Sequence, residues 1–318
     1  MGRPDVSLII PVFEQHALLP LVFEGLRRQD FGGRLEILVC DDGSQADHRM
    51  LVEREAERGT DVRYIWQPHR GRGVARSRNN GIRCAQGDLL IFLDGDSLAP
   101  SNFISTHVSA HRKEKVLFCG SRKQVFLEPK DIAGWQTMRI EELVQKMDGL
   151  PHRSMRAWQE EIYVRAPWRI CMGCNASVPR ADCVGFDEEL TGWGCEDVEF
   201  GCRLVARHNY TISIDPLSFV YSIEFGDEAG FSRVRPKSHE DIILCLKDLL
   251  RVRGLYPEID TSPLLLMAQY FAIDPVTNQW HQLPEAAAQE RNTDEAIQQA
   301  MTWLAANQRE LVRSKEQK

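Results

Sequence analysis

Two carboxylates separated by one glycine, Asp94 and Asp96, directly follow the apolar run 89–93. Such a run is typical of a strand that is buried on both faces, so the two acids would lie where this strand opens to solvent. Acids this close repel each other and stay ionised when a cation offsets their charge. Mg²⁺ or Mn²⁺ bridging a phosphorylated substrate is the usual cation for such oxygen ligands. The alternative is an Asp-Gly-Asp turn without chemistry.

A second acidic pair, Glu196 and Asp197, follows a loop in which Gly192 and Gly194 provide hinges. Apolar residues recur at helical spacing from Val198 onward, so the pair falls in the first turn of an expected helix. Acids at that position also complement the helix dipole, which is an explanation without catalysis. The two acidic pairs are the strongest candidates for chemistry in the chain.

The elements that would position the first pair alternate between strand and helix over residues 1–100. This order predicts an α/β fold: a mostly parallel central sheet with right-handed crossovers, helices on both faces and a helical C-terminal extension. Ligands of such sheets bind at the carboxyl ends of the strands. The segments expected at those ends are 13–14, 41–42, 67–68 and 94–96.

Composition limits the class of protein. The 318 residues carry a net charge of -7, which gives no broad attraction to nucleic acid or an anionic membrane. No apolar run approaches a spanning length, and residues 1–5 lead into a strand without a signal peptide, so we expect a cytoplasmic protein, at most peripheral to the inner face of the membrane. The nine cysteines indicate reduced thiols, with a zinc site formed by Cys171 and Cys174 together with Cys183, Cys195 and Cys202 as the alternative.

Four motifs in the first 100 residues resemble those of the family 2 glycosyltransferases, which have the GT-A fold. The motifs are Ser-Leu-Ile-Ile-Pro-Val-Phe at 7–13, Val-Cys-Asp-Asp-Gly-Ser at 39–44, Gly-Val-Ala-Arg-Ser-Arg-Asn-Asn-Gly-Ile at 73–82 and Phe-Leu-Asp-Gly-Asp-Ser at 92–97. A chance match of four ordered motifs is far rarer than a match of one. The resemblance implies a transferase that uses a nucleotide-sugar, most simply a UDP-sugar, together with Mn²⁺ or Mg²⁺.

The resemblance also implies roles for residues of the nucleotide site. Pro11, Val12 and Glu14 would border the base. Asp42 would accept a hydrogen bond from the N3–H of uracil, because a carboxylate suits a base edge that presents a donor.

Three further roles concern the phosphates and the metal. The guanidinium of Arg78 would bind a base edge or a phosphate oxygen, and the alternative is a solvated charge on a helix. Asp94 would contact the ribose or the metal, and Asp96 would bind the metal.

The stretch Gly-Trp-Gly-Cys-Glu-Asp-Val-Glu-Phe at 192–200 is similar to the acceptor-site motif of galactosyltransferase-like GT-A enzymes and bacterial chain-extending family 2 enzymes. Carried over, Asp197 is the catalytic base, Glu196 positions the acceptor and Trp193 offers an apolar face to a sugar ring. The expected reaction is a single displacement that inverts the anomeric centre, with the metal as Lewis acid and no covalent intermediate.

One position departs from this pattern. Related enzymes commonly supply a further metal ligand, a histidine, where this chain has Ser222. Glu224 or His239 are the candidate replacements. Without a replacement, metal dependence itself would be in question.

We expect a glycosyltransferase domain over 1–232, with a nucleotide-sugar half at 1–100 and an acceptor half at 101–232, followed by a helical extension at 233–318. The stretch 135–168 is either a lid or acceptor wall or ordinary helix packing. The extension either packs on the domain, mediates an oligomer or docks a partner. Its last helix is expected to begin near Thr293.

Two other functions compete with glycosyl transfer. A sugar-phosphate nucleotidyltransferase would carry a glycine-rich loop after its first strand, and Pro-Val-Phe-Glu at 11–14 does not match that loop. A non-catalytic nucleotide-sugar or glycan binder would explain the missing histidine. The sugar, and whether the acceptor is a saccharide, a lipid-linked saccharide, a peptide or a small molecule, stay open.

Overall fold

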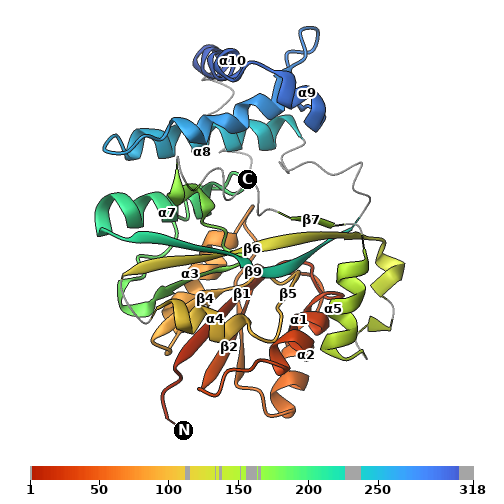
Figure 1. Cartoon of the computed structure of the whole chain (residues 1–318). Helices are drawn as coiled ribbons and strands as arrows, with labels where there is room; N and C mark the ends of the chain where they lie inside the picture. The colour runs from red at the N-terminus through yellow and green to blue at the C-terminus, as the bar shows by residue number, and fades with distance from the viewer. Residues whose placement is uncertain are drawn as a thin grey trace.

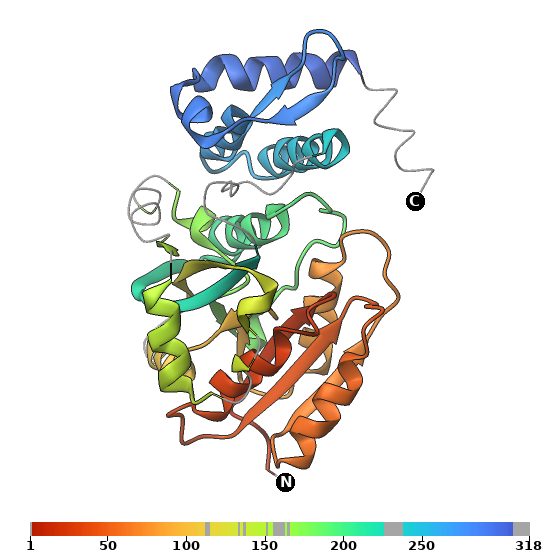
Figure 2. The same ribbon diagram turned by 90° about the vertical axis from the view of Figure 1, so that its right-hand side faces the viewer.

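The first half of the chain forms a parallel sheet with intervening helices (Figures 1 and 2). The computed structural model describes residues 2–111, 115–132, 134–135, 138–150, 152–154, 163, 166–225 and 238–307. The elements of this half are β1 (Val6–Val12), α1 (Leu19–Arg27), β2 (Leu35–Asp41), α2 (His48–Glu57), β3 (Val62–Trp66), α3 (Val74–Cys84) and β4 (Leu89–Phe92). The strands pair in parallel in the order β3-β2-β1-β4, as the sequence predicts.

The second half extends the same sheet with strands of mixed direction and of very different lengths. Its elements are β5 (Ser97–Leu98), α4 (Phe103–Ala110), β6 (Val116–Leu127), η1 (Pro129–Ile132), α5 (Ile140–Gly149), β7 (His152–Ser154), η3 (Pro167–Ile170), β8 (Ala176–Pro179), η4 (Arg180–Asp182), α7 (Cys195–His208) and β9 (Thr211–Phe225). The full order is β3-β2-β1-β4-β8-β6-β9-β5, and β7 pairs with β6. The predicted α/β class with a mostly parallel sheet is therefore confirmed.

Both faces of the central strands are covered, which explains the unbroken apolar run before Asp94. In β4, Leu90 and Phe92 pack into a core that includes residues of α3 and α7, while Leu89 and Ile91 pack into a core with α1 and α4. Each such fully buried side chain contributes about 1.5–3 kcal/mol to the free energy of folding. The strand is thus a rigid support for the carboxylates at its end.

A buried polar network crosses the middle of the sheet. His107 contacts Asn175 Oδ1 through Nε2 at 2.9 Å and Ser177 Oγ through Nδ1 at 2.8 Å, and His111 Nε2 lies 2.8 Å from the same hydroxyl. The Asn175 amide donates to Ser121 O at 2.7 Å. Burial lowers the pKa of His107 to about 3 and that of His111 to about 4, so both rings are neutral at pH 7.

The C-terminal extension packs on the domain. It comprises α8 (His239–Leu255), η5 (Ser262–Tyr270), β10 (Phe271–Ile273), β11 (Trp280–Gln282), α9 (Glu285–Glu290) and α10 (Thr293–Ala306). One face of α8 enters the main core through Cys245, Leu249 and Val252, and the other closes a smaller core with Trp280 and Trp303. The predicted final helix is present, but the hairpin β10–β11 was not predicted, because strands of three residues are too short to show alternation.

Parts of the predicted organisation fall outside the described residues. The expected boundary between 232 and 233 lies in 226–237, and much of the expected lid or wall at 135–168 lies in 155–162 and neighbouring gaps.

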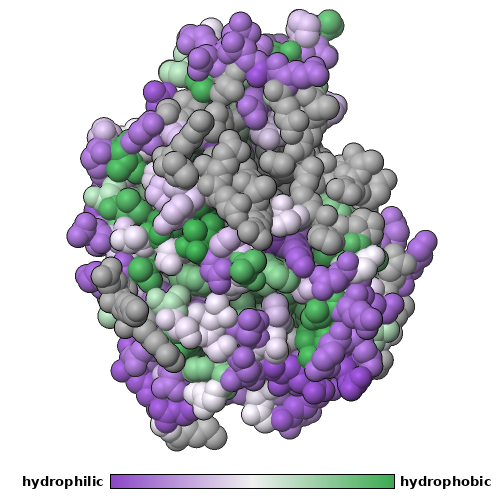
Figure 3. All heavy atoms as spheres, viewed as in Figure 1, coloured by the Kyte–Doolittle hydropathy of each residue, from purple (hydrophilic) through white to green (hydrophobic). Residues whose placement is uncertain are grey.

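Each helix that the structure describes is too short or too polar to cross a bilayer. In Figure 3, hydrophilic residues cover the upper and lower ends of the face shown, and hydrophobic atoms show between them, at the level of β6 and β9 in Figure 1.

Candidate active site

The end of β2 fixes a carboxylate in a cage of donors. Asp42 is buried, and its oxygens accept hydrogen bonds from Gln67 Nε2 at 2.6 Å and Gly73 N at 3.1 Å. His69 Nδ1 and Arg76 Nη2 lie 3.0 and 3.2 Å away. A Cβ at position 73 would lie 2.1 Å from Asp42 Oδ1, so only glycine lets the chain approach this closely. The loop between β3 and α3 is therefore built around Asp42.

The neighbouring Asp41 has a structural role that its sequence position did not reveal. It is buried and accepts hydrogen bonds from Ser44 N at 2.8 Å and Tyr64 OH at 2.9 Å, with His48 Nδ1 at 2.9 Å. Burial raises its pKa, but the hydrogen bonds from His48, Ser44 and Tyr64 outweigh burial and lower the pKa to about 2. Asp41 thus stays ionised and holds the turn at Gly43, where φ is 76°.

The residues expected at the base lie at the end of β1. Pro11 and Val12 are buried within the strand, in register with β2, and Glu14 follows the strand end with φ of 53°. Glu14 N donates to Ser44 Oγ at 2.9 Å, and Glu14 Oε1 accepts from Gln45 N at 2.6 Å. These contacts offset the unfavourable backbone conformation of a non-glycine residue. The ends of β1 and β2 are therefore held together as one edge.

An aromatic pair at the same edge was missed by the sequence analysis. The ring of Phe13 stacks on that of His69, with centroids 4.3 Å apart and 14° between planes, although Phe13 is 44% exposed. The available signal was an aromatic residue placed directly after a buried strand. The pair offers a flat face beside Asp42, because His69 also contacts that carboxylate.

Gly95 lets the Asp94–Asp96 segment pass close to β1. A Cβ at position 95 would lie 2.3 Å from Gln15 Oε1 and 2.6 Å from Val12 Cγ1. The segment is further fixed by a hydrogen bond from Ile223 N to Asp96 O at 3.0 Å. The structure thereby brings the two carboxylates to the carboxyl edge that also holds Asp42, as the sequence predicts.

The guanidinium of Arg78 connects the two acidic pairs. Its Nη1 donates to Asp197 Oδ1 at 2.6 Å and lies 3.4 Å from Glu196 Oε1, and its Nη2 donates to Asp94 Oδ1 at 3.0 Å. The Arg78 side chain is only 2% exposed, so the alternative of a solvated helix charge is wrong. A Cβ at Gly173 would lie 2.3 Å from this guanidinium. A planar fork is well suited to hold several carboxylates at once.

The second acidic pair holds its protons more tightly than free carboxyls. Burial and the adjacent Asp197 raise the pKa of Glu196 to about 7. Burial also raises the pKa of Asp197, against the opposing effects of Arg78 and of a 2.9 Å hydrogen bond from Gly173 N. Glu196 Oε2 is buried and has no hydrogen-bond partner among the described residues. This pair can take up a proton near neutral pH.

The loop before the pair belongs to the same site. Gly194, with φ of 70°, is the N-cap residue of α7, and the carbonyl of the half-buried Trp193 accepts from the thiols of Cys195 and Cys245. Trp193 lies two residues before Cys195, the first residue of α7. Its carbonyl contacts a side chain of α7 and one of α8, so both helices hold it in place.

The candidates for a third metal ligand lie in different places. Ser222 pairs with Ser97 in the β5–β9 ladder, beside Asp96, and Glu224 is two residues further along β9. His239 instead receives a hydrogen bond from Trp280 N at 2.8 Å, within the C-terminal core. Of the three, Ser222 and Glu224 lie on the strand next to Asp96.

The carboxylates at this edge fit a divalent cation that a diphosphate also coordinates. Asp94 and Asp96 are hard oxygen donors at a partly exposed edge, with Asp94 31% exposed. Within the part of the chain that the structure describes, no three His, Cys, Asp or Glu residues are grouped as a complete metal site. Cys171 and Cys174 are buried, and burial raises the pKa of Cys174 to about 12, so this thiol stays protonated and does not favour zinc.

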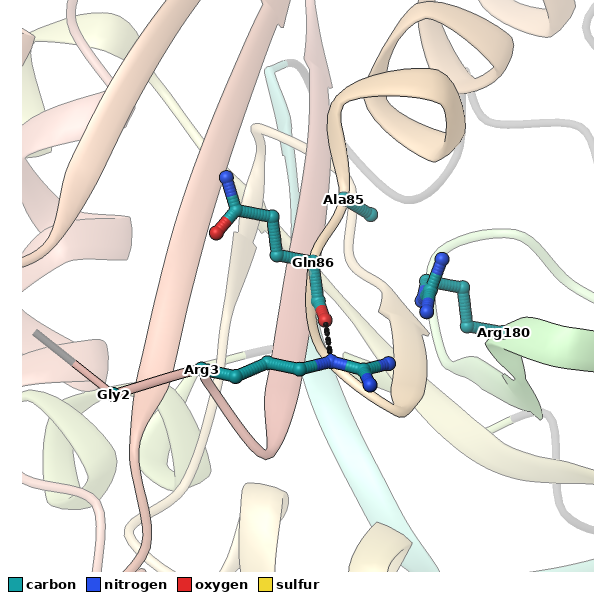
Figure 4. Close-up of a pocket in the computed structure, with 5 residues that line it drawn as sticks. All are labelled: Gly2, Arg3, Ala85, Gln86 and Arg180. Atoms are coloured by element: carbon teal, nitrogen blue, oxygen red, sulfur yellow. Dashed lines mark hydrogen bonds between the residues drawn. The ribbon is translucent and has the colours of Figure 1, made fainter.

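A pocket of about 460 Å³ opens at the opposite edge of the sheet (Figure 4). It is lined by Gly2, Arg3, Ala85, Gln86 and Arg180, which flank the starts of β1 and β4 and the end of β8. Arg3 Nε donates to Gln86 O, and Arg180 Nε donates to Gly87 O, both at 2.8 Å. These arginines support the chain at the edge remote from the carboxylates.

This arrangement, a parallel sheet whose carboxyl edge gathers Asp42, Asp94 and an acidic helix start, is that of a GT-A domain. Mannosyltransferase PcManGT from Pyrobaculum calidifontis, in complex with GDP-Man and Mn²⁺, superposes with a TM-score of 0.55 at 19% identity, covering 96% of this chain and 75% of that one. GalNAc-T7 with UDP, GalNAc and Mn²⁺ superposes at 0.53 and 16% identity, covering 80% and 48%. These likenesses show the fold.

The family follows from sequence comparison. The family model described as "Glycosyl transferase family 2" matches residues 7–168 of this chain. A second family model, described as "N-terminal domain of galactosyltransferase", matches residues 153–224. The chain belongs to glycosyl transferase family 2, which confirms the resemblance. Validoxylamine A glucosyltransferase of Streptomyces hygroscopicus subsp. limoneus is 30% identical over an alignment of 273 positions that covers 80% of this chain. The chain spans 58% of that relative's length.

Proposed function

We propose that this protein transfers a hexosyl group from a nucleotide-sugar, a UDP-sugar in the first instance, to an acceptor hydroxyl with inversion at the anomeric carbon. The observation that carries the proposal is the Arg78 fork, which joins Asp94 at the end of β4 to Asp197 at the start of α7. A donor bound at Asp94 would then have its anomeric carbon between the ends of β1 and β2, where the nucleotide would bind, and the carboxylate of Asp197.

The nucleotide would bind across the ends of β1 and β2. The flat face of Phe13 on His69 suits stacking of a base, and the neighbouring Asp42 suits a base edge with an N–H donor. Glu14, Pro11 and Val12 would border this position. Uracil offers such a donor at N3, which supports UDP. The solved GT-A neighbours hold GDP-Man in one case and UDP in another, so the fold itself is compatible with either.

Asp94 and Asp96 would hold Mn²⁺ or Mg²⁺ together with the donor diphosphate. When bound, the metal would neutralise negative charge on the leaving nucleoside diphosphate as a Lewis acid. Both neighbours cited above contain Mn²⁺, which supports a divalent ion at this edge. Glu224 on β9, or a water held by Ser222, would complete the ligand set.

Asp197 would act as the base. Its carboxylate takes the proton of the acceptor hydroxyl while the acceptor oxygen bonds to the anomeric carbon and the bond to the diphosphate oxygen breaks with its electron pair. The raised pKa of Asp197 makes the carboxylate more basic than a free one. A single displacement of this kind inverts the anomeric centre and needs no nucleophilic side chain.

Glu196 and Trp193 would position the acceptor. Glu196 Oε2 is buried and has no hydrogen-bond partner among the described residues, so it can hydrogen-bond a second acceptor hydroxyl. The Trp193 ring suits the apolar face of a sugar. The relative named validoxylamine A glucosyltransferase supports a glucosyl donor as the first choice.

The test is calorimetric binding of UDP, GDP and CDP, first with Mn²⁺ and then with EDTA. We expect one nucleotide to bind with Mn²⁺ and to lose at least tenfold affinity with EDTA or in Asp96→Asn. Asp88→Asn is the matched control, because Asp88 is an exposed acid at the opposite edge. Absence of binding by all three nucleotides would refute the donor site.

A further inference from the structure

Helix α8 of the C-terminal extension holds the loop that precedes the acidic pair. Gly192 N donates to Asp248 Oδ2 at 2.5 Å, and the Thr191 amide also bonds this carboxyl group. Asp248 is only 8% exposed. A buried carboxylate that accepts two amide hydrogens fixes a loop firmly, because loss of the acceptor would leave both amides unsatisfied.

The loop and the helix also meet backbone to backbone. A Cβ at Gly192 would lie 2.8 Å from Cys245 Cα, so only glycine permits this approach. The Cys245 thiol donates to Trp193 O at 3.9 Å, and Cys195 Sγ lies 3.7 Å from both Trp193 O and Cys245 O, between which its single proton can be shared. The contacts with α8 thus bracket Trp193 on both sides.

A second buried contact joins α7 to the end of α8, two helices that lie one above the other in Figure 1. Glu199, 2% exposed, accepts hydrogen bonds from Tyr256 OH and from Arg203 Nη2, the latter at 2.9 Å. Tyr256 directly follows α8 and is buried in the main core. The helix that begins with Glu196 and Asp197 is therefore fixed against α8 at two points.

We propose that Asp248 is a positioning residue for the acceptor loop, so that the C-terminal extension forms part of the acceptor subsite. The proposal rests on the proposed function of Trp193 and Asp197. Gly192 and Gly194 restrict the backbone conformation of the loop little. The hydrogen bonds from the loop amides to Asp248 restrict it instead. The extension is then required for use of the acceptor and not for binding of the nucleotide.

The experiment compares Asp248→Ala with Asp248→Asn, which retains an oxygen acceptor, and with Asp241→Ala, an exposed acid on the same helix. Hydrogen exchange is followed by mass spectrometry. We expect amides of residues 191–195 to exchange at least tenfold faster in Asp248→Ala, with β1 unchanged, and the other two variants to match the wild type. Unchanged exchange in this loop, or equal acceleration throughout the domain, would overturn the proposal.

Kinetics supplies the second readout, with UDP-glucose as donor and methyl β-D-glucoside as the acceptor probe. Asp248→Ala should raise the acceptor KM about tenfold and leave the donor KM within twofold, and Asp248→Asn should restore most of the loss. A rise in the donor KM instead would contradict the proposal. A wild type that neither binds UDP nor transfers glucose would refute the proposed function, whereas the exchange experiment would still decide whether Asp248 orders the loop.

Discussion

The Nη1 atom of Arg78 lies 2.6 Å from Oδ1 of Asp197, while the Nη2 atom of the same guanidinium lies 3.0 Å from Oδ1 of Asp94. One buried cation therefore contacts both the carboxylate that follows β4 and the one that begins α7. In the proposed reaction, these are the donor and acceptor sides of the displacement. Arg78 couples them physically.

Replacing Arg78 by Met should strongly destabilise the fold. Removal of the cation leaves the carboxylates of Asp94, Glu196 and Asp197 close together without their partner, and breaking a buried pair of this kind costs about 3–5 kcal/mol. The loss should be smaller at pH 5 than at pH 8, because protonation relieves the repulsion. Urea denaturation measures both values.

Arg83→Met is the control for this substitution. Arg83 lies on the same helix, but its side chain is 60% exposed, so the change should alter stability by less than about 0.5 kcal/mol. Equal losses of stability in the two variants would show that the buried ion pairs of Arg78 contribute no more than the exposed contacts of Arg83.

Trp193→Ala should impair use of the acceptor more than use of the donor. Loss of the apolar ring face should raise the acceptor KM about tenfold, which corresponds to about 1.4 kcal/mol, with the donor KM within twofold. Steady-state kinetics with each substrate varied in turn separates the two constants. Trp193→Phe retains an aromatic face and should lie near the wild type. An equal rise in both constants would remove Trp193 from the acceptor site.

The His107 network predicts acid sensitivity of the fold. The pKa of His107 is about 6.5 in the unfolded chain and about 3 in the folded one, so the unfolded state binds more protons between these values. The stability that the neutral His107 ring contributes is fully present above pH 6.5. It is lost as the pH falls from 6.5 toward the folded-state pKa of about 3. By pH 4.5 the loss from this group is about 2–3 kcal/mol.

Urea midpoints between pH 7 and pH 4.5 test this dependence. His107→Gln cannot ionise and should show a flatter profile below pH 6.5 than the wild type, even if it is less stable at pH 7. His208→Gln is an exposed-histidine control that should preserve the wild-type slope. A slope that does not change in His107→Gln would contradict the assignment.

The first half of the fold could be predicted from local patterns in the sequence. Of the four strands before Asp94, β1, β2 and β4 show buried β-rich runs and β3 shows a half-buried one. Each strand reaches a polar residue at its end or within the next two positions, so their common edge followed from the rules of parallel sheets. The helix that begins at Cys195 was likewise visible in the spacing of apolar residues after Gly194. These features depend on neighbours in the sequence.

The contacts that join the elements depend on residues far apart. Arg78 meets Asp197 across 119 positions, and Gly192 meets Asp248 across 56, and no periodicity connects such residues. The sequence analysis therefore offered a phosphate, a base edge or solvent for Arg78 and did not single out Asp248. Its assignments of Asp42, Asp94, Asp96, Glu196 and Asp197 to roles in catalysis and binding stay predictions.

The most direct test of the account is Asp197→Asn, assayed for sugar transfer and for binding of the Mn²⁺ complex of UDP. The substitution keeps an oxygen toward Arg78 but removes the base, so transfer should fall at least a thousandfold while nucleotide affinity stays within threefold. Turnover close to that of the wild type would contradict the role of Asp197 as base and with it the proposed mechanism.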